Sequence, residues 1–288
     1  MYALKKMEYL APKTLNEALL LLNCYGNKAK IIAGGTDLIP LLKRRALPSP
    51  EYLIDLNSIQ GFRFIEYDGK NGLKIGALTS IRELEKSQIV KEKFPSLHKA
   101  CRLIGHLPVR NIATVGGNIC RASPASDLIP PLLTFDSKLK IVSSEGERNI
   151  ELENFFKGPG QTVLKPNEIV IEVDSPPIES DLKMVFIKKS RTFSDLAKIN
   201  MALLAAVKNN VLEYIRIALG SVAPVPLRAR KTEEFLKGKI LNGNIVEEAL
   251  DLIASEVHPI TDLRSTAEYR RHMCKIMLKR VLFELMEE

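Results

Sequence analysis

Two pairs of adjacent glycines, Gly34-Gly35 and Gly116-Gly117, place the strongest constraint on how this chain folds. The first pair lies within residues 31–38, where it follows an apolar segment and precedes a polar one. That pattern predicts a short strand, a glycine turn and the start of a helix. Glycine lacks a Cβ, so its backbone can approach a ligand closely, and amides at a helix start attract anions. The element therefore predicts a phosphate-binding turn.

The second pair lies in the segment from Asn111 to Asp127, where Thr114 and Asn118 flank the glycines with neutral hydrogen-bonding side chains. Successive amides that point in one direction form a nest suited to phosphate oxygens. Taken alone, the segment also fits a polar surface loop whose glycines serve only a tight turn. Neither pair belongs to a P-loop or to a GxGxxG motif. Because two similar elements occur in one chain, we expect them to hold a pyrophosphate between two subdomains.

The composition bounds the class of protein. The 288 residues are 45% hydrophobic, and no apolar run reaches the roughly 18 residues that a membrane span needs. The amino terminus lacks the pattern of a signal peptide, so we expect a cytoplasmic protein. The net charge of +8 comes from dispersed Lys and Arg, and no nucleic-acid partner is expected. The four cysteines show no CxxC spacing, which argues against metal ligation within the chain.

The succession of predicted elements indicates two domains. Strand 29–33, helix 36–46 and strand 52–56 predict a β-α-β unit at the start. Ser175-Pro176-Pro177 is the best linker, because consecutive prolines interrupt both helix and sheet. We therefore expect a first domain over residues 1–177 and a second over 178–288. The first would divide into subdomains of about 1–57 and 58–177.

The second domain is predicted to be α+β, with antiparallel strands beside helices. Asn209-Asn210 tolerates a tight hairpin turn between two of its strands. The expected strands are 183–188, 197–208 and 211–219, and the expected helices are 230–237, 245–256 and 266–286.

Six segments spread along the chain carry a more specific pattern. They are IIAGGTDLIPLLK (31–43), RNIATVGGNICRASPASDLIPPLL (110–133), FFKGPGQTVLKPNEIVIEV (155–173), KKSRTFSDLAKINMA (188–202), LGSVAPVPLRA (219–229) and DLRSTAEYRRHM (262–273). In this order they resemble the FAD-binding medium subunit of the molybdenum hydroxylases, the family of xanthine dehydrogenase and carbon monoxide dehydrogenase. The resemblance implies a two-subdomain FAD-binding domain of the p-cresol methylhydroxylase (PCMH) type, followed by an α+β C-terminal domain.

The resemblance also implies a function and partners. Such a subunit is part of a multi-subunit oxidoreductase and passes electrons from 2Fe–2S clusters on a partner chain, through FAD, to NAD+ or another acceptor. The implied partners are a molybdopterin-binding large subunit and a 2Fe–2S small subunit, assembled as a dimer of heterotrimers. The chain's own residues show no catalytic constellation and no metal-ligand set, which suits a protein that leaves the chemistry to its cofactor.

The resemblance transfers a set of cofactor-binding residues onto this sequence. Residues 31–38 would wrap the pyrophosphate and adjoining flavin, and residues 114–118 would contact the phosphates and the ribityl chain. Asp127 would accept a hydrogen bond from a cofactor hydroxyl, Lys188 would lie beside the flavin, and Ile104 stands where xanthine dehydrogenases place a phenylalanine against the ring. The full set is Ile31, Ile32, Ala33, Gly34, Gly35, Thr36, Asp37, Leu38, Ile104, Thr114, Val115, Gly116, Gly117, Asn118, Asp127, Lys188, and, bordering the isoalloxazine or adenine, Ile169 and Val170.

Two other functions fit the residues. One is a freestanding FAD-dependent oxidoreductase of the same flavin fold, although no acid or base is aimed at a substrate. The other is a non-catalytic module that binds nucleotides or nucleic acid, suggested by the basic balance. Visible absorption by bound flavin would exclude the non-catalytic binding module. Copurification of two further chains would distinguish the subunit of a complex from the freestanding oxidoreductase.

Overall fold

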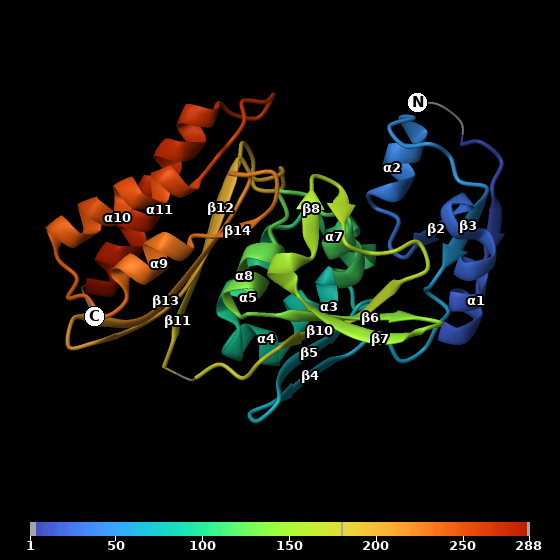
Figure 1. Ribbon diagram of the computed structural model, residues 1–288, viewed down its shortest axis with the longest axis horizontal. Helices are drawn as coiled ribbons and strands as arrows, with labels where there is room; N and C mark the ends of the chain where they lie inside the picture. Colours follow the sequence, from blue (N-terminus) through green and yellow to red (C-terminus); the bar gives the residue numbers. More distant parts are fainter. Residues whose placement is uncertain (1–3, 180, 287–288) are drawn as a thin grey trace.

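The computed structural model describes residues 4–179 and 181–286. Figure 1 shows an elongated molecule, with the first β-α-β unit at one end and the C-terminal helices at the other. Three larger sheets and one two-stranded ribbon, each built from its own part of the chain, make up the described strands. Within the described ranges, no helix has the length and apolar character that a membrane crossing requires.

The N-terminal subdomain is a parallel three-stranded sheet in the order β1-β3-β2, which confirms the predicted β-α-β unit. Its elements are β1 (Glu8–Leu10), α1 (Leu15–Tyr25), β2 (Ala29–Ile32), α2 (Leu38–Lys43) and β3 (Tyr52–Asp55). Helix α1 begins where Thr14 Oγ1 accepts the amide of Glu17 at 3.2 Å. Helix α2 is shorter than the predicted 36–46, and β1 was not predicted, because three residues carry no periodic signal.

The second subdomain is built on a five-stranded antiparallel sheet in the order β4-β5-β10-β6-β7. Its strands are β4 (Ile65–Asp68), β5 (Gly72–Gly76), β6 (Lys138–Ser143), β7 (Gly146–Glu151) and β10 (Ile169–Ser175). Six short helices lie between β5 and β6: α3 (Ile81–Lys86), α4 (Gln88–Lys93), α5 (Pro95–Leu103), α6 (Leu107–Ile112), α7 (Val115–Cys120) and α8 (Ile129–Thr134). Ile169 and Ile171 of β10 share a core with α1, whereas Val170 and Val173 belong to the core of these helices. Strand β10 therefore lies at the seam between the two subdomains.

The segment around Gly116-Gly117, for which a nest of amides or a polar surface loop was expected, is helical. Gly116 and Gly117 occupy the first turn of α7, and Thr114 caps it by accepting the amide of Gly117 at 3.1 Å. The prediction of an open loop was wrong here, because a threonine cap outweighs the weak helix propensity of two glycines.

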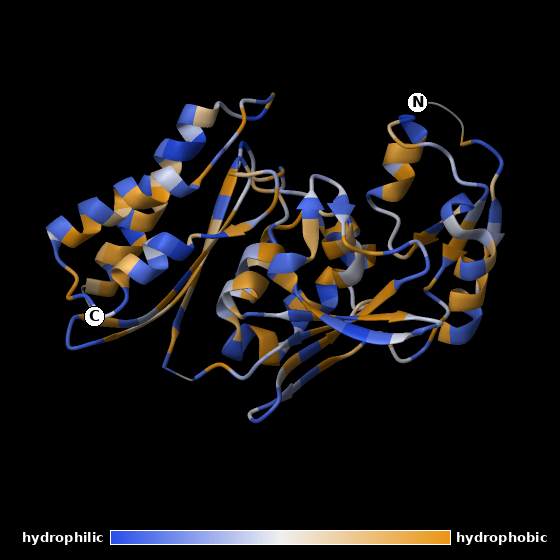
Figure 2. Cartoon of the chain, in the orientation of Figure 1, coloured by the Kyte–Doolittle hydropathy of each residue, from blue (hydrophilic) through white to orange (hydrophobic). Residues whose placement is uncertain are grey.

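The C-terminal domain is a four-stranded antiparallel sheet covered on both faces. Its elements are β11 (Lys183–Lys189), β12 (Ile199–Lys208), β13 (Val211–Gly220), β14 (Leu227–Arg228), α9 (Arg230–Leu236), α10 (Gly243–Glu256) and α11 (Ala267–Met286). Helices α9 to α11, which carry both hydrophobic and hydrophilic residues (Figure 2), pack on one face, and α5 and α8 pack on the other. The near-continuous apolar sequence of β12 follows from this double coverage. The predicted hairpin is confirmed, with φ of 50° at Asn209 and 62° at Asn210.

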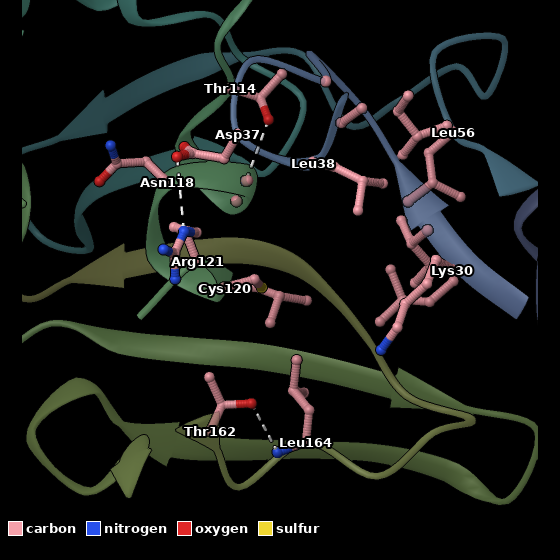
Figure 3. Close-up of a pocket in the computed structure, with 18 of the residues that line it drawn as sticks. Lys30, Asp37, Leu38, Leu56, Thr114, Asn118, Cys120, Arg121, Thr162 and Leu164 are labelled. Carbon is pink, nitrogen blue, oxygen red and sulfur yellow. Dashed lines mark hydrogen bonds and ion pairs between the residues drawn. The ribbon is translucent and has the colours of Figure 1, made fainter. Parts of the chain in front are cut away.

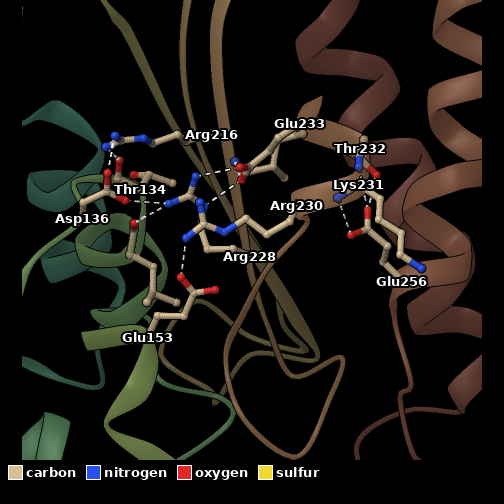
Figure 4. A network of polar contacts seen from close by, with 12 residues as sticks. Thr134, Asp136, Glu153, Arg216, Arg228, Arg230, Lys231, Thr232, Glu233 and Glu256 are labelled. Carbon is tan, nitrogen blue, oxygen red and sulfur yellow. Dashed lines mark hydrogen bonds and ion pairs between the residues drawn. The ribbon is translucent and has the colours of Figure 1, made fainter. Parts of the chain in front are cut away.

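A polar network fixes this sheet to the end of α8 (Figure 4). The guanidinium of Arg228 is buried, and it donates to Glu233 at 2.7 Å, to Asp136 at 2.8 Å and to the carbonyl of Leu133 at 3.1 Å. Arg216 also pairs with Asp136. Leu133 and Asp136 belong to the first domain, and their partner Arg228 belongs to the second. The network therefore holds the two domains in one orientation.

Candidate cofactor-binding site

A cavity of about 770 Å³ lies at the seam between the two subdomains (Figure 3). Its walls come from the turn after β2, from helix α7, and from the segment between β8 (Phe156–Gly158) and β10. Pockets for small molecules and cofactors in proteins have volumes of about 300–1,000 Å³. The cavity is therefore of the size class that takes a large cofactor. All the predicted site residues line it except Ile104, Val115, Asp127 and Lys188.

The turn after β2 presents free backbone donors to this cavity. Within the described part of the chain, the amides of Gly34, Gly35, Thr36 and Asp37 have no hydrogen-bond acceptor. Gly35 has a φ of 68°, a conformation that favours glycine. Residues 34–36 are half-buried and Asp37 is exposed. Half-buried amides are usually paired, so this succession of unpaired donors indicates a place for an anionic ligand.

The predicted equivalence of the two glycine elements is wrong in one respect. The amides of α7 are already bonded within the protein: Gly116 donates to the carbonyl of Ala77 at 2.8 Å and Val115 to that of Thr79 at 2.9 Å. A Cβ on Gly116 would lie 2.8 Å from the Cβ of Ala77, so this glycine serves close packing. Thr114 and Asn118 line the cavity, and Asn118 Oδ1 accepts from Ser126 at 2.6 Å. This element therefore shapes the cavity, while the first supplies its free main-chain donors.

The two glycine elements touch each other at Gly34. A Cβ at this position would lie 2.7 Å from the carbonyl carbon of Ile112 and 2.9 Å from the Cα of Ala113. Both are backbone atoms that cannot move out of the way. Glycine at residue 34 is required because the chain before α7 passes directly against it.

Three cations of the cavity wall, Arg121, Lys30 and Lys165, were missed by the sequence analysis, and the first two lie on opposite sides of the cavity (Figure 3). Arg121 follows α7 and lies 3.6 Å (Nε to Oδ1) from Asp37. Arg121 comes directly after the glycine element in the sequence, and that position was the only available signal. Together the three side chains bring positive charge to a cavity that already has free amide donors.

The cavity wall formed by the segment between β8 and β10 is held in place by a buried carboxylate. Glu168 accepts two hydrogen bonds from Arg148, both 2.8 Å, and a third from the amide of Lys165 at 2.8 Å. The bidentate Arg148 guanidinium lowers the pKa of Glu168. The segment that Glu168 holds contains β9 (Gln161–Thr162) and follows the Gly158-Pro159-Gly160 sequence. This ion pair therefore fixes one wall of the cavity.

We expect cofactor retention to fall as the pH drops below the ordinary pKa of a glutamate. The folded pKa of Glu168 is lowered, so its ion pair stabilises the wall above the ordinary pKa and loses that effect as the pH falls through the folded value. Glu168→Gln should remove this acid-side step and weaken cofactor binding at neutral pH. Release of flavin during acid titration measures both effects. Glu147→Gln, in the exposed pair with Lys140, is the control, and an equal shift in both variants would contradict the assignment.

Asp127 and Lys188 lie together, outside the cavity lining. Lys188 Nζ donates to Asp127 at 2.7 Å and to the carbonyl of Leu103 at 2.8 Å, and Asn200 donates to Asp127 at 2.7 Å. Burial raises the pKa of Asp127 against the opposing effect of Lys188 and Asn200. Val115 is wholly buried in the core, and Ile104 is the C-cap residue that follows helix α5. Direct cofactor contacts of these residues stay predictions.

Cys120 lines the cavity as a protonated thiol. Burial raises its pKa to about 12, so the reactive thiolate is not populated at neutral pH. Across residues 4–179 and 181–286, no group of three or more His, Cys, Asp and Glu side chains could hold a metal ion.

Two family models match the chain in succession. Residues 5–178 match the FAD binding domain in molybdopterin dehydrogenase, and residues 185–285 match the CO dehydrogenase flavoprotein C-terminal domain. The chain belongs to the FAD-binding subunits of the molybdenum hydroxylases. This finding confirms the predicted fold class, the FAD cofactor and the assignment to a multi-subunit oxidoreductase.

Known members of this family match over nearly the whole chain. The glyceraldehyde dehydrogenase medium chain of Sulfolobus acidocaldarius is 35% identical, over 97% of this chain and 98% of that one. The xanthine dehydrogenase FAD-binding subunit of Escherichia coli O157:H7 is 30% identical, over 89% and 88%. A carbon monoxide dehydrogenase from Hydrogenophaga pseudoflava, solved without the Mo-pyranopterin moiety, superposes with a TM-score of 0.92 at 34% identity, covering 96% of each chain.

The residues of the cavity fit FAD. The four free amides from Gly34 to Asp37 suit the oxygens of a diphosphate, and Arg121 supplies a nearby positive charge. The apolar side chains of Ile31, Ile169 and Val170 suit the flat rings of the cofactor.

Proposed function

We propose that this chain is the FAD-bearing electron-transfer subunit of a molybdenum hydroxylase complex. In this proposal it receives electrons from 2Fe–2S clusters on a small partner subunit and passes them to NAD+ or another acceptor. A molybdopterin-binding large subunit oxidises the substrate, and the assembly is a dimer of heterotrimers. The cavity with its row of free amides is the observation that carries the proposal. The relatives named medium chain and FAD-binding subunit support it.

The bound flavin would supply the redox chemistry, because it accepts and releases electrons one or two at a time. The chain's own residues hold and surround it. The amides of Gly34 and the three residues after it would hold the diphosphate, and Gly116 allows α7 to pack closely against Ala77. The Arg148–Glu168 pair keeps the segment between β8 and β10 in position.

The division of the chain belongs to the same proposal. We place the FAD-binding domain at residues 1–177 and the C-terminal domain at 178–288, supported by family matches that end at 178 and begin at 185. The C-terminal sheet covers α5 and α8, so in this proposal it acts as a rigid support for the flavin domain.

Expressed alone, the chain is expected to bind FAD in a one-to-one ratio and to show no hydroxylase activity. Its described residues form a binding site for the cofactor, and the substrate that the complex oxidises would bind to another subunit. Flavin absorption of the purified chain measures the first property, and product analysis with aldehydes, purines and carbon monoxide measures the second. Hydroxylation by the chain alone, free of other subunits and metals, would contradict the proposal.

The test of electron transfer uses the complex purified from its natural source. Copurification of two further chains, one containing iron and the other molybdenum, is the expected composition. Addition of the complex's substrate without an acceptor should bleach the flavin, and addition of NAD+ or another acceptor should restore its absorption. A flavin that stays oxidised while the iron–sulfur clusters become reduced would overturn the proposed path. Turnover of a substrate by the chain alone would instead favour a freestanding oxidoreductase.

A further inference from the structure

We propose that Arg121 is a positioning residue for the cofactor, with its guanidinium directed at the diphosphate that the Gly34–Asp37 amides bind. The inference rests on the assignment of FAD to this cavity and goes beyond it. It assigns a specific charge partner on α7 to a group held mainly by the other subdomain. In this role Arg121 makes FAD binding depend on both glycine elements.

The first observation is an unsatisfied donor. Arg121 Nε is buried and has no hydrogen-bond acceptor within the described residues. A buried donor on a charged group is costly to leave unpaired. The carboxylate of Asp37 lies 3.6 Å away, within range of an ion pair but too far for a hydrogen bond. The guanidinium is therefore only partly satisfied by the protein, which leaves donors for a ligand.

The second observation is its position. Arg121 and Asp37 both line the cavity and face each other across the meeting point of the two subdomains (Figure 3). Asp37 ends the row of free amides, so an anion on those amides lies close to the guanidinium. A planar guanidinium is well suited to phosphate oxygens, because it can donate two parallel hydrogen bonds.

The third observation is the space kept beside the side chain. A Cβ on Gly160 would lie 3.3 Å from Arg121 Nη1, and the amide of Gly160 is fixed to the carbonyl of Ala122 at 2.9 Å. Gly160 has a φ of 71°. The backbone at Gly160 thus passes close to the guanidinium, where a side chain would press on it.

The charge of Asp37 separates two possible roles of Arg121. If Arg121 only ties α7 to the turn after β2, its partner is Asp37, and removal of either charge has the same effect. If Arg121 binds the diphosphate, the carboxylate of Asp37 acts as a competing anion at the same place, and its removal makes FAD binding tighter. The two variants therefore give opposite results under the proposed role.

The experiment measures binding of FAD, ADP and riboflavin to the full chain freed of flavin, by calorimetry. Arg121→Gln is expected to raise the Kd for FAD and for ADP by about 10- to 100-fold, the loss typical of a charged hydrogen bond. Riboflavin, which has no phosphate, should bind equally to both proteins. Arg121→Lys should recover part of the affinity for FAD. Asp37→Asn should bind FAD more tightly than the wild type.

Arg264→Gln, which removes an arginine from the half-exposed pair with Asp262, is the control and should bind all three ligands normally. The role of Arg121 would be overturned if Arg121→Gln lost the same affinity for riboflavin as for FAD, or if Asp37→Asn lost as much affinity for FAD as Arg121→Gln. Either result would leave the assignment of FAD to the cavity in place. A wild-type chain that bound no FAD would overturn the cofactor assignment and this inference with it.

Discussion

Replacing Gly34 with valine is expected to abolish FAD binding and to lower the free energy of unfolding by at least about 1–3 kcal/mol. A Cβ at this residue meets the backbone of Ile112 and Ala113, so the two glycine elements must separate. Separation moves the free amides of residues 34–37 away from α7 and Arg121. Flavin content after purification and urea unfolding followed by circular dichroism measure the two effects.

Gly69→Val is the matched control for this substitution. Gly69 lies in the turn between β4 and β5, and a Cβ there meets no atom within 4 Å. This variant should keep its flavin and change stability little. Full flavin content in Gly34→Val would show that the contact with Ile112 and Ala113 is not needed for the cavity.

Lys188→Met is expected to lower the free energy of unfolding by about 3–5 kcal/mol, because it leaves the carboxylate of Asp127 buried without its cation. The side chain of Lys188 is 2% exposed and that of Asp127 is 5% exposed, so water cannot replace the lost partner. The pair joins β11 of the C-terminal domain to the residues before α8, so its loss should also loosen the contact between the domains. Urea unfolding at neutral pH gives the change.

Two further variants identify the cause of that loss. Lys140→Met breaks a pair with the same 2.7 Å separation at the surface, and it should cost less than about 1 kcal/mol. The double variant Lys188→Met, Asp127→Asn should recover part of the stability, because no buried charge remains. The single variant Asp127→Asn completes the cycle. A loss in the double variant equal to the sum of the losses in Lys188→Met and Asp127→Asn would show that the two residues do not interact.

Structural features that depend only on residues close together in the sequence can be predicted from the sequence. The capping box of α3 is one case: Ser80 Oγ accepts the amide of Glu83 at 3.1 Å, and Glu83 accepts the amide of Ser80 at 2.7 Å. The hairpin at Asn209-Asn210 is another, because asparagine tolerates a positive φ. The β-α-β order and the turn at Gly34-Gly35 follow from the same kind of local preference. These features predict local elements, whereas the fold of the first domain and the set of cavity residues came from the resemblance of six segments to a known family.

Other features depended on partners distant in the sequence. The two glycine elements look alike as sequence, yet only the structure shows that Ala77 and Thr79 occupy the amides of the second. Arg121 follows no periodic pattern, and it lies in the cavity because the end of α7 meets the turn after β2. Which donors stay free, and which charges meet, is decided by the packing of segments that local propensity does not bring together. The sequence by itself therefore determined the family and the local elements of this protein, and the tertiary structure decided which of their atoms are available to the cofactor.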